Sequence, residues 1–79
     1  MTTEQKATID RLIRKKMVRD FIMNTRAWCE QHHRSSLGDI TNSYNEAVYS
    51  GANHFIREIG RVDMEAMRYM LESIEGRNP

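Results

Sequence analysis

The stretch that most directly indicates the fold runs from Ile9 to Ile22 and reads IDRLIRKKMVRDFI. An apolar residue recurs in it at every fourth position, as on one ridge of an α-helix; these residues are Ile9, Ile13, Met17 and Phe21. Upstream, Thr2 and Gln5 have the spacing of a capping box, which satisfies backbone amides at a helix start. We therefore expect a helix over residues 3–23.

The same helix carries apolar residues away from that ridge. Leu12, Val18 and Ile22 lie to its side, so the expected helix is apolar on two faces. A chain of 79 residues buries only about 60% of the surface that it exposes when unfolded, and its core is thin. We therefore predict that the face formed by Leu12, Val18 and Ile22 is not covered within one molecule and contacts a protein partner.

The residues that follow also have helical spacing of apolar side chains. After a stop at Asn24-Thr25 we expect a short helix over residues 25–33; the alternative is one unbroken helix to about Gln31. The segment from Arg34 to Asn42 is rich in Ser, Gly, Asp and Asn. That composition predicts a loop.

Two more helices are expected after this loop. Ser43 and Glu46 have the spacing of a second capping box, which predicts the start of a helix over residues 43–59. Asp63 can cap a final helix over residues 63–75 because its side chain accepts hydrogen bonds from the first free amides.

These helices predict one all-α domain over residues 1–79, folded as a small three-to-four-helix bundle. Helical spacing also indicates which residues of the last three helices face its core. They are Trp28, Cys29 and His32 in the first of these; Tyr44, Ala47, Val48, Gly51, Ala52, Phe55 and Ile59 in the second; and Met64, Met67, Met70, Leu71 and Ile74 in the third.

The composition excludes several classes of protein. Apolar residues make up 39% of the chain and charged residues 29%, as in an ordinary folded domain. The one cysteine cannot close an intramolecular disulfide. No apolar run approaches the about 18 residues that cross a membrane, and no apolar segment of a secretion signal follows the N-terminus. We therefore expect a reducing, aqueous compartment and no membrane contact.

Cys29, His32 and His33 have helical spacings that could suit a metal ion, with His54 as a further ligand from another helix. A structural zinc site usually needs four ligands in two pairs, and the second pair is missing. A buried, unreactive Cys29 is the better interpretation. Phosphate-binding loops, nucleophile elbows and paired carboxylates are also missing. We therefore predict no metal, no cofactor and no enzymatic activity.

A basic ridge is a second candidate contact surface. Arg11, Lys15 and Arg19 follow one another at four-residue steps, without an acidic residue one turn away on the same ridge. The chain through Arg34 has eight basic and four acidic side chains, a net of +4, and the rest has four and seven, a net of −3. The ridge could be solvated, face an acidic surface of a partner or second copy, or bind phosphates. Nucleic acid is less favoured because aromatic residues are not interleaved with it.

The middle of the chain, about residues 18–59, resembles a known family. The resemblance rests on Phe21, Trp28-Cys29, Arg34-Ser35-Ser36, Ala47, Ser50-Gly51-Ala52-Asn53, Ile56 and Ile59. These residues are similar to those of short helical proteins of short-tailed (podovirus-type) tailed bacteriophages, encoded among virion and morphogenesis genes. The family's last helix tends to carry an acidic-Gly-basic-basic string, from which Ser50 and Asn53 depart. The resemblance implies a phage origin and a non-enzymatic role.

One functional expectation combines these observations. We expect a small non-enzymatic helical protein of a tailed phage, in the virion or the host cytoplasm. It would act by contacts with itself or with another phage or host protein, in virion assembly or as a minor virion component. The alternatives are a phage regulator that binds nucleic acid and an inhibitor of a host protein. The predicted contact residues are Arg11, Leu12, Lys15, Val18, Arg19 and Ile22.

Overall fold

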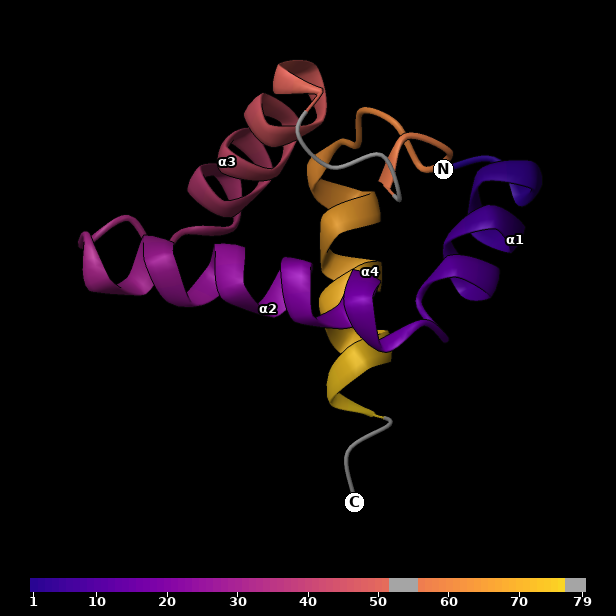
Figure 1. Ribbon diagram of the computed structural model, residues 1–79, viewed down its shortest axis with the longest axis horizontal. Helices are drawn as coiled ribbons and strands as arrows, with labels where there is room; N and C mark the ends of the chain where they lie inside the picture. Colours follow the sequence, from indigo (N-terminus) through magenta and orange to yellow (C-terminus); the bar gives the residue numbers. More distant parts are fainter. Residues whose placement is uncertain (52–55, 77–79) are drawn as a thin grey trace.

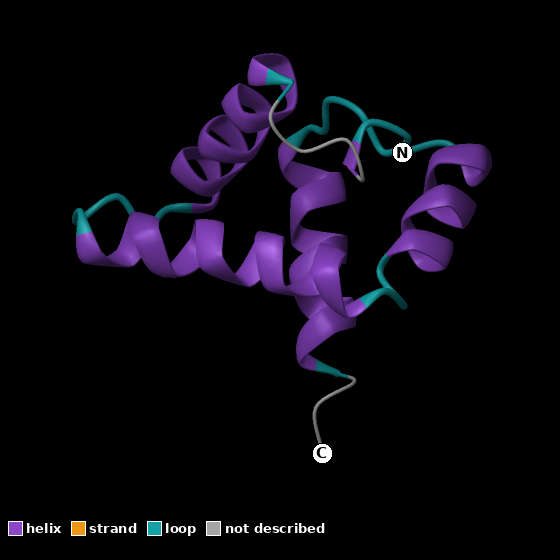
Figure 2. Ribbon diagram, in the orientation of Figure 1, coloured by secondary structure: helices purple, strands orange, loops and turns teal. Residues whose placement is uncertain are grey.

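The computed structural model describes residues 1–51 and 56–76 of the chain. Within these two ranges it contains four α-helices and no strand (Figures 1 and 2). The prediction of a small all-α bundle is therefore confirmed. Residues expected to face the core or to serve as a metal ligand, but lying outside the described ranges, are Ala52, Phe55 and His54.

Helix α1 spans Thr3–Leu12 and is much shorter than the helix expected over residues 3–23. It begins as predicted, because Thr2 Oγ1 accepts a hydrogen bond from the Gln5 amide at 3.0 Å. This bond satisfies one of the amides that a helix start leaves without a partner. The capping signal thus located the start of α1, whereas the apolar spacing did not indicate where it ends.

A corner over residues 13–15 separates α1 from the next helix. Ile13 is fully buried there. Arg19 Nη1 donates hydrogen bonds to the carbonyl oxygens of Ile13 (3.1 Å) and Arg14 (2.6 Å). These two carbonyls would otherwise lack the amide partners of a continuing helix. Arg19 therefore stabilises the break that divides the expected long helix into two.

Helix α2 spans Lys16–Gln31, so the stop expected at Asn24-Thr25 is wrong and the alternative end near Gln31 is confirmed. The helix ends in a Schellman motif, in which two amides bond back to carbonyls of the last turn. The His33 amide donates to Glu30 O at 3.3 Å, and the Arg34 amide donates to Cys29 O at 2.8 Å. His33 adopts the left-handed conformation that this motif needs, with φ 57°.

Helix α3 spans Leu37–Ser50 rather than residues 43–59. Its N-cap is Ser36, whose Oγ accepts from the Asp39 amide at 3.1 Å. The predicted loop over residues 34–42 and the predicted cap at Ser43 are therefore wrong, since both lie largely within the helix. Gly51 ends α3 with φ 71°, a conformation that glycine adopts without steric cost.

Helix α4 spans Met64–Glu75, within one residue of the prediction. Asp63 caps it as expected, since a side-chain oxygen accepts from the Ala66 amide at 2.8 Å. Just before this cap, the buried side chain of Asn45 on α3 bonds both the N–H (2.9 Å) and the C=O (2.8 Å) of Val62. This pair of bonds fixes the start of α4 against α3.

The core lies where α2 contacts both α3 and α4. Figure 1 shows α2 passing across α4, with α3 beside one end of α2 and α1 near the other. Residues from all four helices enter the core. The buried apolar residues are Ile9, Leu12, Ile13, Val18, Ile22, Cys29, Ile40, Tyr44, Ile56, Ile59, Val62, Ala66, Met67, Met70, Leu71 and Ile74.

Candidate functional site

The apolar part of the predicted contact surface is not on the surface. Leu12 is 1% exposed, and Val18 and Ile22 are 0% exposed. The prediction that one molecule cannot cover this face is therefore wrong. The corner over residues 13–15 changes the chain direction, so that α1 and α2 each turn a different side toward the same core.

The basic part of the predicted surface does not form one ridge. Arg11 on α1 forms an ion pair with Glu58, and this hydrogen bond lowers the pKa of the Glu58 carboxyl below its ordinary value. Arg19 on α2 donates to backbone carbonyls of the corner. Lys15 is exposed at the N-cap of α2. Four-residue spacing predicts a shared face only on an unbroken helix, and the helix is broken between these residues.

A different face of α2 is exposed and partly apolar. Met17, on the predicted apolar ridge, is 62% exposed, and Trp28, which was expected to face the core, is 46% exposed. Phe21 is half-buried, and Asn24 is exposed. At 100° per residue these four side chains fall within an arc of about 60°. We call this set, Met17, Phe21, Asn24 and Trp28, the outer stripe.

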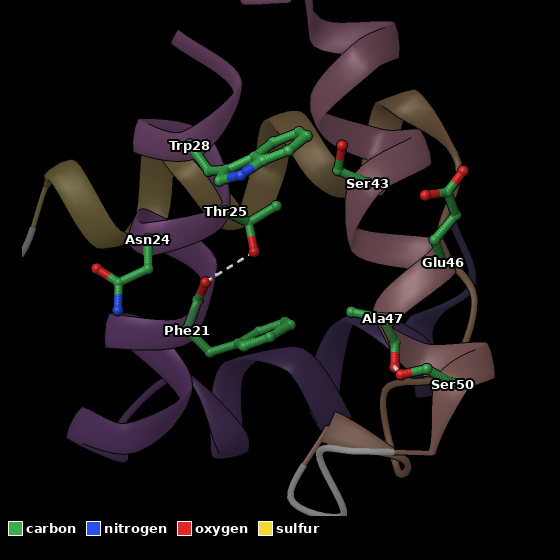
Figure 3. A pocket seen from close by; sticks show the side chains of 8 residues that line it. All are labelled: Phe21, Asn24, Thr25, Trp28, Ser43, Glu46, Ala47 and Ser50. Atoms are coloured by element: carbon green, nitrogen blue, oxygen red, sulfur yellow. Dashed lines mark hydrogen bonds between the residues drawn. The ribbon is translucent and has the colours of Figure 1, made fainter. Parts of the chain in front are cut away.

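Three residues of the outer stripe, Phe21, Asn24 and Trp28, lie along one wall of a groove between α2 and α3. The groove has a volume of about 390 Å³. Its lining residues are Phe21, Asn24, Thr25 and Trp28 from α2 and Ser43, Glu46, Ala47 and Ser50 from α3. Figure 3 shows the rings of Phe21 and Trp28 lying toward α3, with Asn24 and Glu46 turned outward at the two rims. The floor of the groove is therefore more apolar than its edges.

Internal hydrogen bonds reduce the polarity of the groove further. Thr25 Oγ1 donates to the carbonyl of Phe21 at 2.9 Å, and Ser50 Oγ donates to the carbonyl of Ala47 at 2.8 Å (Figure 3). Ser43 Oγ accepts from the Cys29 thiol at 3.3 Å. A ligand with an apolar face can cover these hydroxyls at less cost than it could cover unbonded ones.

Trp28 is held in place before any ligand binds. Its ring stacks on the ring of His32, with centroids 4.1 Å apart and planes 24° apart. The His32 ring is itself fixed because Nδ1 lies 2.8 Å from the Trp28 carbonyl oxygen. A carbonyl only accepts hydrogen bonds, so Nδ1 is the donor. A side chain that is already ordered loses less entropy when it binds.

The groove supplies little catalytic or metal-binding chemistry. Cys29 is fully buried beneath it, as the packing interpretation predicted, and its thiol bonds a serine rather than a base. No cluster of three or more His, Cys, Asp or Glu residues suited to a metal ion occurs in residues 1–51 and 56–76. Among those same residues, none of the helices has the length and apolar character that crossing a membrane requires.

Sequence reasoning missed the outer stripe, although its spacing is visible. The four positions are separated by four, three and four residues, the spacing of a heptad seam. The competing ridge from Ile9 to Phe21 concealed it, because both patterns share Met17 and Phe21. Only the position of the corner decides which pattern is real.

Comparison with known proteins does not extend this description. No family model, curated protein or solved structure matches the chain.

Proposed function

We propose that this chain is a small non-enzymatic interaction protein whose α2–α3 groove receives a helix of another protein chain. The observation that carries the proposal is the exposed, pre-positioned Trp28 at the edge of an apolar groove. Tryptophan is among the residues most enriched at the energetic centres of protein interfaces. The exposed Trp28 ring is continuous with the apolar floor of the groove, and contiguous exposed apolar surface commonly marks an interaction site.

The shape of the groove favours a helix as the ligand. It lies between two helices, and its apolar contributions come from Phe21, Trp28 and Ala47. A helix can place side chains at i, i+3 or i+4, and i+7 into such a groove. Glu46 on the rim has no ion-pair partner among the described residues, so a basic residue beside the apolar face of the ligand would complement it.

The biological setting follows from the resemblance to short helical proteins of short-tailed bacteriophages. A protein of this kind would act in virion assembly or as a minor virion component, in the virion or in the host cytoplasm. The Cys29 thiol donates to the hydroxyl of Ser43, a residue that lines the groove, and not to a general base. This contact favours a packing role for Cys29 and supports a binding role for the groove.

Site-specific photo-crosslinking tests the proposal. We would place p-benzoyl-phenylalanine at Asn24, on the rim of the groove, and in a control protein at Arg68, which is exposed on α4. Both proteins are expressed in infected cells, irradiated, and analysed by mass spectrometry. We expect a specific adduct from position 24, which Trp28→Ala abolishes, and no such adduct from position 68.

The possible results separate the parts of the proposal. Equal adducts from both positions, or none from position 24, would overturn the groove as a binding site. A specific adduct with a protein that is neither a virion nor a morphogenesis component would retain the binding role and overturn the phage assembly role.

A further inference from the structure

We infer that the helix bound in the groove is α2 of a second copy of this chain, packed antiparallel along the outer stripe. This inference rests on the proposed function, because it names the partner for the same groove. It is carried by the spacing of the stripe, by the residues that an antiparallel pairing would cover, and by the charges at the two ends of α2.

The spacing of the outer stripe suits a helix like α2 itself. Its residues are separated by four, three and four positions, and two helices with this seam pack along their length. α2 has 16 residues, which makes it about 24 Å long. The stripe extends over most of that length, with Met17, Asn24 and Trp28 exposed and Phe21 partly buried against the core. The outer stripe of one copy can therefore be the binding surface for the outer stripe of a second copy.

The antiparallel arrangement covers the two exposed apolar residues of the stripe, Met17 and Trp28, with each other. With the two-fold axis between Phe21 and Asn24, Met17 of one copy lies opposite Trp28 of the second copy. A methionine sulfur near the edge of an aromatic ring is a favourable contact. The same arrangement places each Phe21 ring opposite the Asn24 of the other copy. A polar residue within a seam commonly specifies its register.

Charges decide between antiparallel and parallel packing. Near Met17 the cations Arg14 and Lys15 form no ion pair with any described residue, although Lys15 also interacts electrostatically with Glu58. Near Trp28 the corresponding carboxylates are those of Glu46, on the groove rim, and Asp39, whose carbonyl oxygen lies 4.0 Å from Cys29 Sγ.

At the Trp28 end, Arg34 follows α2 and forms no ion pair with another residue in the described ranges. It leaves the balance at that end negative, against a positive balance at the Met17 end. Antiparallel packing brings these opposite ends together, whereas parallel packing would bring like charges together. The helix dipoles also oppose each other favourably in this arrangement.

The pairing covers only about two heptads, so we expect a weak dimer. An interface of this length lies at the small end of specific interfaces. We expect a dissociation constant on the order of 100 µM. Such a dimer would be monomeric when dilute and would form where the protein is locally concentrated.

Sedimentation equilibrium of the full chain between about 10 µM and 1 mM tests the inference. Trp28 is the only tryptophan, so its fluorescence emission should shift to shorter wavelength over the range in which the dimer forms. We expect Trp28→Ala to weaken dimerisation at least tenfold. Tyr49→Ala is the matched control, because Tyr49 is 70% exposed on α3 but does not line the groove.

Charge reversal tests the orientation. In an antiparallel dimer Lys15→Glu and Glu46→Lys change the charge of ends that lie near each other, so each should weaken association several-fold and the double variant should recover part of the loss. In a parallel dimer either single change leaves like charges facing each other, so neither restoration nor loss is expected. A dimer that behaves in the second way would overturn the antiparallel arrangement.

Failure of this inference and failure of the proposed function give different results. A strict monomer at 1 mM that still gives a specific adduct from position 24 with a different protein would overturn the second copy as ligand and retain the groove as a binding site. A strict monomer with no adduct would overturn both. A concentration-dependent dimer whose position-24 adduct has twice the mass of the chain would support both.

Discussion

The two sides of helix α2 differ in what covers them, although both are apolar. Cys29 and Trp28 are neighbours in the sequence, yet the first is 0% exposed and the second 46% exposed. Val18 and Ile22 share the covered side, where α3 and α4 pack. The uncovered side lines the groove. Apolar spacing therefore identifies faces that avoid water, but only the arrangement of neighbouring helices determines which face the molecule covers itself.

Removing side chains from each face should have very different effects on stability. Ile22→Ala creates a cavity in a fully buried site, and we expect it to lower the free energy of unfolding by about 2–5 kcal/mol. Met17→Ala removes a mostly exposed side chain, and we expect a change within about 0.5 kcal/mol. Urea unfolding at low protein concentration measures both. Similar losses in the two variants would show that both faces are buried.

Tyr44 provides a second contrast, because it lies beneath the groove and carries a buried polar atom. Its ring meets Phe21 edge-on at 6.0 Å, and its hydroxyl has no hydrogen-bond partner among residues 1–51 and 56–76. Burying an unpaired hydroxyl costs about 1–3 kcal/mol. We therefore expect Tyr44→Phe to raise the free energy of unfolding by about 1 kcal/mol, as measured by urea unfolding. A loss of stability would show that the hydroxyl is hydrogen-bonded.

The same burial makes stability depend on alkaline pH. Burial raises the pKa of the Tyr44 hydroxyl above its ordinary value, since the charged form is disfavoured in the core. Below pH about 10 the hydroxyl is neutral in both states. At higher pH the unfolded chain releases this proton and the folded chain does not, so stability falls by up to about 1.4 kcal/mol per pH unit. Tyr44→Phe should remove this part of the pH dependence, whereas the exposed control Tyr49→Phe should not.

The sequence was sufficient for the fold class and for helix ends marked by side-chain caps. Thr2 and Asp63 begin their helices as predicted. It was insufficient where the decisive interaction is tertiary. Nothing local in the sequence marks Arg19 as the residue that bonds the carbonyls of the corner. The unbroken-helix assumption then assigned Val18 and Ile22 to the wrong side.

The same tertiary dependence limited the prediction of the candidate site. Trp28 was expected to face the core, but it is 46% exposed. The start of α3 was also misplaced, because the helix begins at Leu37, earlier than the second capping signal indicated. Ser36 and Ser43 both have suitable side chains for a cap, and local spacing does not distinguish them.

The backbone conformation at the C-terminal end of α2 provides a test with a smaller expected effect. His33 adopts a left-handed conformation with φ 57°, which costs a residue with a Cβ roughly 1 kcal/mol relative to glycine. We expect His33→Gly to raise the midpoint of thermal unfolding by a few degrees. Gly51→Ala is the matched opposite change, because Gly51 has a similar φ of 71° at the end of α3, and it should lower the midpoint. A decrease for His33→Gly would show that the imidazole contributes more than its backbone costs.

The last test needs no substitution. It compares the solvent accessibility of two adjacent residues, Trp28 and Cys29, in the native protein. In the native dilute protein, acrylamide should quench Trp28 fluorescence readily, while a thiol reagent should react with Cys29 only as fast as the molecule opens. Urea should increase the thiol reaction by orders of magnitude and the quenching only modestly. Rapid reaction of Cys29 without denaturant would contradict its burial.

The corner that Arg19 stabilises also determines from which end α1 frays. Its last turn is anchored by buried Ile13 and by two bonds from the following helix. Its first turn is largely exposed and is held by the Thr2 cap and by the ion pair between the Met1 amino group and Glu65. Fraying therefore has a direction: it starts at the N-terminal turn and proceeds toward Leu12. We expect the number of helical residues in α1 to decrease from the N-terminal end as temperature rises, while the junction with α2 stays intact.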